Sequence, residues 1–264
     1  MSSQQKNINV ALVGNPNSGK STLFNSLTGL SQKTGNYAGV TVDKHIGNFT
    51  HHNIHITLTD LPGTYSLFPK SLDEEVACKA ILNSSTEEID VIVIVADASN
   101  VKRHLLLATQ IIDLKKPCVL ALNMIDEAEK QNIVIYKDEL ENLLGVPVVN
   151  VNSRNKVGLK ELKDSIINAK ISNSLFYDLE KLSKLSPTYN NYKEVIEGQF
   201  TNNLEEHKKI EQFEKEDNIS RFTKLNYITA KCVKKPEQLN KSITQKLDAI
   251  FTHKFFGFAF LASK

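Results

Sequence analysis

Cysteine is scarce in this 264-residue sequence, which contains three. Cys78, Cys118 and Cys232 are far apart and odd in number, so they fit neither a disulfide framework nor a zinc site built from paired cysteines. The lack of such a framework favours a reducing compartment.

The sequence also lacks a large excess of either charge. Lys and Arg total 32 against 30 Asp and Glu, which gives a formal net charge of +2. This balance excludes a global basic field of the kind that binds nucleic acid or an anionic membrane surface. We therefore expect no nucleic-acid partner, and we expect any polyanionic ligand to be bound locally.

Long apolar runs are absent as well. The longest, residues 255–262, reads FFGFAFLA and is well short of the ~20 residues that span a bilayer. The polar start, MSSQQKN, lacks the basic and apolar regions of a secretory signal. The sequence as it stands is expected not to cross a membrane.

What the sequence does contain is the composition of a folded globular protein, 41% hydrophobic and 23% charged. Up to about residue 170, short β-branched runs alternate with longer amphipathic segments, a pattern that predicts an α/β domain with a mostly parallel sheet. The predicted strands cover residues 8–13, 54–59, 91–96, 119–123 and 146–151, with residues 45–49 added as an antiparallel hairpin arm. Helices are expected after Gly19, Leu72, Arg103, Lys137 and Gly158.

Beyond residue 170 the pattern changes. Most glycines lie at or before Gly158, and apolar residues then recur at steps of three and four within 175–185, 196–204 and 239–250. We predict a first domain over residues 1–170 and a small helical domain over residues 171–252.

A glycine-rich loop directly follows the first predicted strand. Residues 14–21 read GNPNSGKS, the spacing of a phosphate-binding loop placed between a strand and a helix. Lys20 is expected to neutralise the β- and γ-phosphates, and the Ser21 hydroxyl to hold magnesium. The candidate nucleotide contacts are Gly14, Asn15, Pro16, Asn17, Ser18, Gly19, Lys20, Ser21 and Thr22. The alternative is an ordinary glycine-rich turn between a strand and a helix.

Two further motifs end later predicted strands. In DLPG, residues 60–63, Asp60 can reach a magnesium ion and Gly63 can offer its N–H to a γ-phosphate. In NMID, residues 123–126, Asp126 can accept two hydrogen bonds from guanine, which adenine cannot supply. Each tetrapeptide alone is a weak signal. Their order, each at the carboxyl end of a predicted parallel strand, indicates a guanine-nucleotide site.

The order GxxxxGKS, DLPG, NMID resembles that of the Ras-like small GTPases. The resemblance implies a P-loop GTPase domain with a mostly parallel six-stranded sheet and helices on both faces, followed here by the small all-α domain. It also implies base contacts from Asn123 and Met124. The fifth motif of these GTPases, which binds the base through a backbone N–H, corresponds to Asn152, Ser153 and Arg154.

Residues 35–42 read GNYAGVTV, which is similar to the first switch, GNWPGVTV, of the bacterial ferrous iron transport protein B family. This similarity places Thr41 at the magnesium-binding threonine and Gly39 among the nucleotide contacts. It continues through DLPGTYSL and the helical domain, and residues 253–264 resemble the start of a truncated first transmembrane segment, although a last helix buried in the bundle is the alternative. The sequence departs from the family at Tyr37, Ala38 and Lys254.

The resemblance implies a magnesium-dependent GTPase that converts GTP to GDP and phosphate. It would serve as the cytosolic regulatory domain of a ferrous iron transporter, at the cytoplasmic face of the bacterial inner membrane. The implied partners are GTP, GDP and the transporter's own transmembrane domain. A homo-oligomer and small accessory iron-transport proteins are further partners that the resemblance allows. Related GTPases use potassium, here held by Asn17 and carbonyls of residues 36–39. The candidate catalytic residues are Lys20, Asn17, Thr41 and Gly63.

Two other functions are compatible with the motifs. A soluble regulatory GTPase of ribosome or tRNA maturation would share the phosphate loop, Thr41 and DLPG. Thr64 stands where Ras-like GTPases usually have a water-orienting glutamine, so hydrolysis is expected to be slow. A nucleotide-binding module without significant turnover is therefore the second alternative.

Three histidines, His51, His52 and His55, cluster on the predicted hairpin. On a strand, His51 and His55 would share a face while His52 pointed away, and no carboxylate or cysteine completes the set in the sequence. An exposed hairpin is therefore favoured over a metal site.

Overall fold

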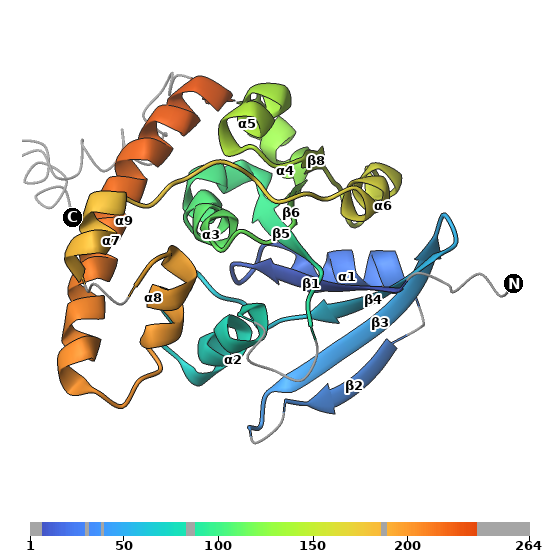
Figure 1. Ribbon diagram of the computed structural model, residues 1–264. Coiled ribbons are helices and arrows are strands. Elements are labelled where there is room, and N and C mark those ends of the chain that lie inside the picture. The colour runs from blue at the N-terminus through green and yellow to red at the C-terminus, as the bar shows by residue number, and fades with distance from the viewer. Residues whose placement is uncertain (1–6, 30–31, 38–39, 83–87, 186–188, 237–264) are drawn as a thin grey trace, which may run out of the picture. The chain divides into compact units, whose positions relative to one another are not determined.

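The computed structural model describes residues 7–29, 32–37, 40–82, 88–185 and 189–236 (Figure 1). Nearly all of them belong to one compact unit, Met1–Lys234, whereas the second unit, Lys235–Lys264, lies almost wholly outside the described residues. The predictions for residues 239–250 and 253–264, Lys254 included, therefore concern residues that the structure does not describe.

A seven-stranded sheet forms the centre of the described part, in the order β2-β3-β4-β1-β5-β6-β8. The strands are β1 (Asn7–Gly14), β2 (Gln32–Asn36), β3 (Asp43–His51), β4 (Ile54–Asp60), β5 (Val91–Asp97), β6 (Cys118–Asn123) and β8 (Val148–Asn150). β4, β1, β5, β6 and β8 are parallel, and β2, β3 and β4 are antiparallel. The α/β class is confirmed, but the expected count of six strands is wrong, because β2 pairs with β3 through its backbone although its sequence is polar.

The strand register places the motif-bearing ends at one edge of the sheet. Leu12 is paired with Asp60, Asp97 with Asn123, and Leu122 with Asn150. The loops that follow β1, β4, β6 and β8 therefore emerge side by side, at the carboxyl ends where such sheets bind ligands.

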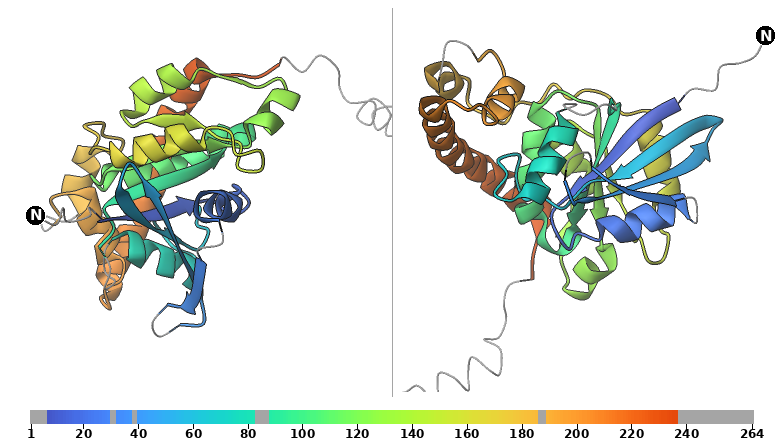
Figure 2. Two further views of the ribbon diagram at one scale, coloured as in Figure 1. Left: turned by 90° about the vertical axis from the view of Figure 1, so that its right-hand side faces the viewer. Right: turned by 90° about the horizontal axis from the view of Figure 1, so that it is seen from below.

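Alternation along the buried strands divides the core between two faces. On β5, Val91, Val93 and Val95 point to one face, and Ile92 and Ile94 to the other. The first face is covered by α1 (Lys20–Thr28) and α6 (Leu159–Ile167), and the second by α2 (Leu72–Ile81), α3 (Val101–Asp113) and α5 (Lys137–Leu144), as Figure 2 shows. Because both faces are covered, the central strands read as continuous apolar runs.

Short elements complete this part of the chain. They are the 3₁₀ helix η1 (Ala98–Asn100), the helix α4 (Ile125–Lys130), and the strands β7 (Val134–Ile135) and β9 (Val233–Lys234), which pair with each other. All three cysteines are free and buried, as the lack of a disulfide framework predicted.

Three helices follow: α7 (Leu179–Leu185), α8 (Tyr192–Gly198) and the long α9 (Leu204–Cys232), which contacts α3, α5 and α7 (Figure 1). The buried residues of α9 recur every three or four positions: Ile210, Phe213, Asp217, Arg221, Leu225, Ile228 and Cys232. Most of them join the same core cluster as α3 and α5, so packing is continuous across residue 170 and the boundary there stays a prediction. Among the described helices, none is both long and apolar enough to cross a bilayer.

The hairpin of β3 and β4 projects on the side opposite to α9 in the views of Figures 1 and 2. His52 and Asn53 form its two-residue turn, with φ values of 48° and 61°. A type I′ turn requires left-handed backbone at both central positions. Because His52 lies in the turn, the strand alternation that would point it away from His51 does not apply to it.

Candidate nucleotide-binding site

The loop between β1 and α1 depends on glycine at two positions. Gly19, which precedes α1, has a φ of 80°, and a Cβ there would lie 2.3 Å from Asn123 Nδ2. At Gly14, a Cβ would lie 2.5 Å from the Val95 carbonyl oxygen. A left-handed backbone and close approach both require the missing side chain. The loop therefore lies directly against the ends of β5 and β6, with the positive end of the α1 dipole behind it.

Asp60, at the end of β4, joins the loop to the DLPG motif. Lys20 Nζ forms an ion pair with Asp60 Oδ1, and the Ser21 hydroxyl donates to Asp60 Oδ2 at 3.0 Å. Asp60 is 6% exposed, and a buried carboxylate needs such partners because it has lost its water. The structure thus brings together Lys20, Ser21 and Asp60, as predicted.

The backbone after Asp60 runs along the phosphate loop. The Thr64 N–H donates to the Gly14 carbonyl at 3.1 Å, and a Cβ at Gly63 would lie 3.0 Å from Pro16 Cγ. The Thr64 side chain is buried, and its hydroxyl donates to the Ser66 carbonyl at 2.7 Å. Gly63 therefore lies beside the phosphate loop as expected, whereas the Thr64 hydroxyl binds the Ser66 carbonyl and not the loop.

A pocket of about 150 Å³ opens at the ends of β6 and β8. It is lined by Gly19, Thr22, Asn123, Met124, Asp126, Glu127, Asn152, Ser153 and Arg154. Three loops that the sequence motifs identified separately therefore form one site.

Asn123 holds these three loops together. Its Nδ2 donates to the Ser18 carbonyl at 3.0 Å. Its Oδ1 accepts from the Ser153 N–H at 3.2 Å and from the Ser153 hydroxyl at 2.7 Å. Because Asn123 is 2% exposed, these bonds form without competition from water, and they position Asp126 at the rim of the pocket.

Two residues near the pocket were not predicted. The Ser26 hydroxyl donates to the Ser153 carbonyl at 2.7 Å, which links α1 to the loop after β8. The available signal was the helical period: Ser26 lies one turn after Thr22 on the predicted helix and therefore on the same side of that helix as Thr22. Glu127 lines the pocket beside Asp126 and pairs with Lys130 at 2.8 Å, and no sequence signal pointed to it.

Two buried polar side chains of the phosphate loop have no hydrogen-bond partner among the described residues. They are the Asn15 amide, in a residue 2% exposed, and the Ser18 hydroxyl. Leaving such a group unsatisfied costs about 1–3 kcal/mol. Neither residue lines the pocket around Asn123, so these atoms do not by themselves indicate a ligand contact.

Thr41 lies apart from this cluster. It is exposed and lines a separate hollow of about 660 Å³ with Val40, Leu72 and Asp73. Within the described ranges, no hydrogen bond links Thr41 to Ser21 or Asp60. The departure Ala38 and the predicted contact Gly39 lie outside the described residues.

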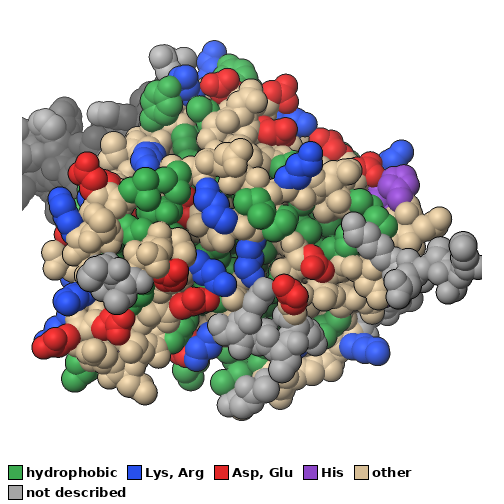
Figure 3. All heavy atoms as spheres, in the orientation of Figure 1, with side chains coloured by type: hydrophobic (Ala, Val, Ile, Leu, Met, Phe, Trp, Pro, Cys, Tyr) green, Lys and Arg blue, Asp and Glu red, His purple; other side chains and the backbone are tan. Residues whose placement is uncertain are grey.

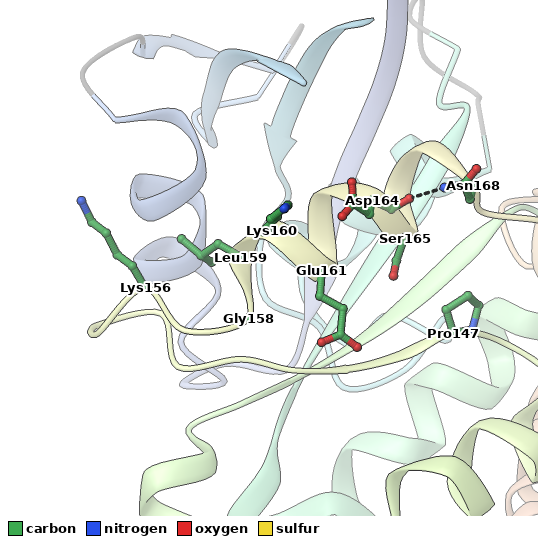
Figure 4. Close-up of a pocket in the computed structure, with 9 residues that line it drawn as sticks. All are labelled: Pro147, Lys156, Gly158, Leu159, Lys160, Glu161, Asp164, Ser165 and Asn168. Carbon is green, nitrogen blue, oxygen red and sulfur yellow. Dashed lines mark hydrogen bonds between the residues drawn. The ribbon is translucent and has the colours of Figure 1, made fainter. Parts of the chain in front are cut away.

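A third hollow, of about 620 Å³, opens at the start of α6 (Figure 4). Its lining residues are Pro147, Lys156, Gly158, Leu159, Lys160, Glu161, Asp164, Ser165 and Asn168. None of them belongs to the predicted nucleotide contacts, so the smaller pocket around Asn123 is the candidate site.

Gly19→Ala tests how tightly these loops are packed. We expect the variant to lose about 1–3 kcal/mol of unfolding free energy, because a left-handed alanine is strained and its Cβ must displace the Asn123 amide. Gly35→Ala is the control, since Gly35 has no left-handed φ and a Cβ there would meet nothing within 4 Å. Equal losses in urea unfolding would contradict this packing.

The fold and the site define a class. A phosphate loop between β1 and α1, DLPG after β4 and NMID after β6 on a mostly parallel sheet are the arrangement of a Ras-like P-loop G domain. A family model described as Ferrous iron transport protein B matches residues 8–166. The chain belongs to this family.

Relatives and solved structures agree with this assignment. The Fe(2+) transporter FeoB of Salmonella typhimurium is 48% identical over 165 residues, which cover 61% of this chain and 21% of that protein. The FeoB of Escherichia coli K12 is 43% identical over 196 residues, or 69% of this chain and 25% of that protein. The chain thus spans a quarter or less of these curated relatives.

The cytosolic domain of L. pneumophila FeoB has a similar structure, with a TM-score of 0.74 and 34% identity, covering 86% of this chain and 100% of that one. The cytosolic domain of T. maritima FeoB in its GMPPNP form has a TM-score of 0.70 and 30% identity, covering 86% and 99%. The fold of the described part is therefore that of FeoB cytosolic domains.

Proposed function

We propose that this chain binds GTP and GDP and hydrolyses GTP slowly, as the cytosolic regulatory part of a bacterial ferrous iron transporter at the cytoplasmic face of the inner membrane. The observation that carries the proposal is the set of Asn123 hydrogen bonds that join the phosphate loop, NMID and Ser153 around one pocket. Family membership and the T. maritima FeoB structure in the GMPPNP form support it.

Different residues of the site would bind the phosphates and the base of the nucleotide. The α1 N-terminus and Lys20 would bind the phosphates, and the Asp126 carboxylate would accept from the guanine N1–H and amino group. Ser153 would present its backbone N–H to the base. Because adenine lacks this pair of donors, the same geometry would exclude ATP.

Magnesium fits the donor set that Ser21 and Asp60 offer. Their Oγ and Oδ2 atoms lie 3.0 Å apart, and hydroxyl and carboxylate oxygens are the ligands that this ion prefers. Thr41 would complete the set. When bound, the ion offsets negative charge on the phosphates.

The position of Thr41 suggests how nucleotide state would be sensed. Thr41 and Gly63 would approach the γ-phosphate, so GTP and GDP would favour different arrangements of residues 34–43 and 63–72. Two contacts connect the second segment to the helical part. Gln199 Nε2 donates to the Leu67 carbonyl at 3.0 Å, and Lys70 pairs with Glu214 at 2.8 Å. We propose these contacts as the route by which the helical part responds.

Hydrolysis would be slow because nothing at position 64 orients a water molecule, given that the Thr64 hydroxyl donates to Ser66. Potassium would then assist. The exposed Asn17 in the phosphate loop has an amide oxygen suited to a monovalent cation, and the carbonyl of Asn36 is a second candidate ligand. When bound, that ion supplies positive charge beside the phosphates.

Asn17→Ala tests this proposal through GTP hydrolysis in potassium and in sodium buffers. The wild-type rate is expected to be higher in potassium, and the ratio of the two rates should fall to about one in the variant, because the loss of the amide removes a ligand. Asn132→Ala is the matched control, since Asn132 shares a left-handed backbone, with φ 53° against 66° at Asn17. An unchanged ratio in Asn17→Ala would refute potassium binding there.

The same assay separates the alternatives. A binding module without turnover would hydrolyse no GTP in either buffer. The soluble GTPase of ribosome or tRNA maturation is disfavoured by the family assignment and by the balanced charge. The transmembrane domain of the same protein, a homo-oligomer and small accessory proteins stay proposed partners.

A further inference from the structure

Two imidazoles and a carboxylate converge at a place remote from the nucleotide site. His51 Nε2 lies 2.7 Å from Asp164 Oδ1, and His52 Nε2 lies 3.0 Å from the same oxygen. The two imidazole centroids are 4.2 Å apart. One potential ligand atom from each residue lies within 4.8 Å of the others.

The fold creates this cluster from segments that are distant in sequence. His51 ends β3, His52 occupies the left-handed turn, and Asp164 lies on α6, 112 residues after His52. The expectation that no carboxylate completes the set is therefore wrong, because Asp164 lies beside His51 and His52, whereas the turn residues His52 and Asn53 are exposed as expected. His51 is only 16% exposed at its side chain, whereas His52 is 67% exposed and leaves the cluster open to solvent.

The chemistry of the three donors selects a class of metal. Magnesium and calcium prefer sites made of oxygen alone, whereas two imidazole nitrogens and one carboxylate suit divalent first-row transition metals, with remaining positions left to water. The side chains of His52 and Asp164 are 67% and 40% exposed, so water can reach the cluster, and Asp164 also lines the hollow drawn in Figure 4. We propose that His51, His52 and Asp164 bind one divalent transition metal ion, with ferrous iron among the ions that fit.

Charged side chains near Asp164 have partners of their own. Lys163 Nζ lies over the Phe49 ring at 4.8 Å, and Glu161 pairs with Lys137 at 3.0 Å, so both are engaged elsewhere. The Asn168 amide donates to the Asp164 carbonyl at 2.9 Å and closes the end of α6 beneath the site.

Figure 3 shows histidine at the surface on one side of the molecule, with acidic and basic side chains near it. Among the residues that the structure describes, no second group of three His, Cys, Asp or Glu side chains has this proximity. The site is independent of the nucleotide pocket, because none of its three residues lines that pocket.

The test is a titration of the 264-residue chain, without an added histidine tag, with cobalt(II), followed by its visible absorption under anaerobic conditions. Ferrous iron and zinc are then added as competitors. We expect one cobalt ion per chain, displaced by both metals. His52→Ala and Asp164→Asn should each weaken binding by about tenfold or more, since loss of even an outer partner of a metal ligand costs about that much.

His55→Ala is the control, because His55 lies on β4 outside the cluster and should bind cobalt like the wild type. Circular dichroism verifies the fold of each variant, and a GDP titration of the same samples tests the nucleotide proposal separately. No cobalt binding, or equal affinity in the wild type and Asp164→Asn, would refute the metal site. The His–Asp contacts would then only hold the hairpin against α6.

Discussion

Replacing Asp126 with asparagine is expected to lower the affinity for GDP by about 100-fold or more. A charge-assisted hydrogen bond contributes roughly 1.5–3 kcal/mol, and Asp126 would make two of them to guanine. An asparagine amide offers one acceptor and one donor group where the carboxylate offers two acceptors, so one contact is lost and the other is weakened.

The same substitution should change the preferred base. Xanthine has a carbonyl where guanine has its amino group, so the asparagine N–H can donate to it, and Asp126→Asn should bind xanthosine diphosphate better than GDP. Competition titrations of both nucleotides measure this. Glu129→Gln, an exposed change on the same helix α4, should leave both affinities unaltered. Wild-type affinity for GDP in Asp126→Asn would show that Asp126 does not contact the base.

Arg221→Met is expected to produce the largest loss of stability, about 3–5 kcal/mol. Arg221 is 0% exposed on α9, and its guanidinium lies 2.7 Å from Asp113 on α3 and 2.6 Å from Asp217. It also lies over the Tyr192 ring at 4.6 Å. Methionine retains much of the volume but leaves two carboxylates buried without their cation, which is the costly change.

Urea unfolding measures the loss, with Arg103→Met as the control, because Arg103 is exposed and only lies over the Tyr65 ring. The loss should depend on pH. Burial raises the pKa of Asp113, Arg221 lowers it, and removing Arg221 therefore raises it further. A folded-state pKa above the unfolded value adds stability as pH falls, so the deficit of Arg221→Met should shrink below neutral pH. A deficit that is constant with pH would exclude Asp113 as its source.

The phosphate loop, DLPG and NMID could be placed from the sequence because their function resides in backbone shape and fixed spacing. Gly19 has a left-handed φ of 80° that favours glycine, and β5 and β6 were visible as apolar runs because both faces of the sheet are covered. Local physics therefore specified most of the candidate site.

Contacts between distant segments could not be predicted in this way. Arg221 and Asp217 occur in a polar helix whose charges look solvated, and only the fold brings Asp113 to them. Asp164 likewise reaches His51 across the fold. Apolar periodicity also misled at Leu179 and Leu204, which are 57% and 79% exposed, because each is the first residue of its helix and the helical period assumed through Leu204 is broken where α8 ends at Gly198. The motif around Thr41 predicted a magnesium ligand, but it could not predict that Thr41 lies at a separate hollow, away from Ser21 and Asp60.

The central claim is that the pocket built around Asn123 and the phosphate loop binds a guanine nucleotide and rejects adenine nucleotides. The most direct test is a calorimetric titration of the purified chain with GDP in magnesium buffer, repeated in the presence of excess ATP and of excess GTP. We expect saturable heat from GDP binding, which excess ATP leaves unchanged and excess GTP abolishes. Absence of GDP binding, or displacement of GDP by ATP as effective as by GTP, would contradict it.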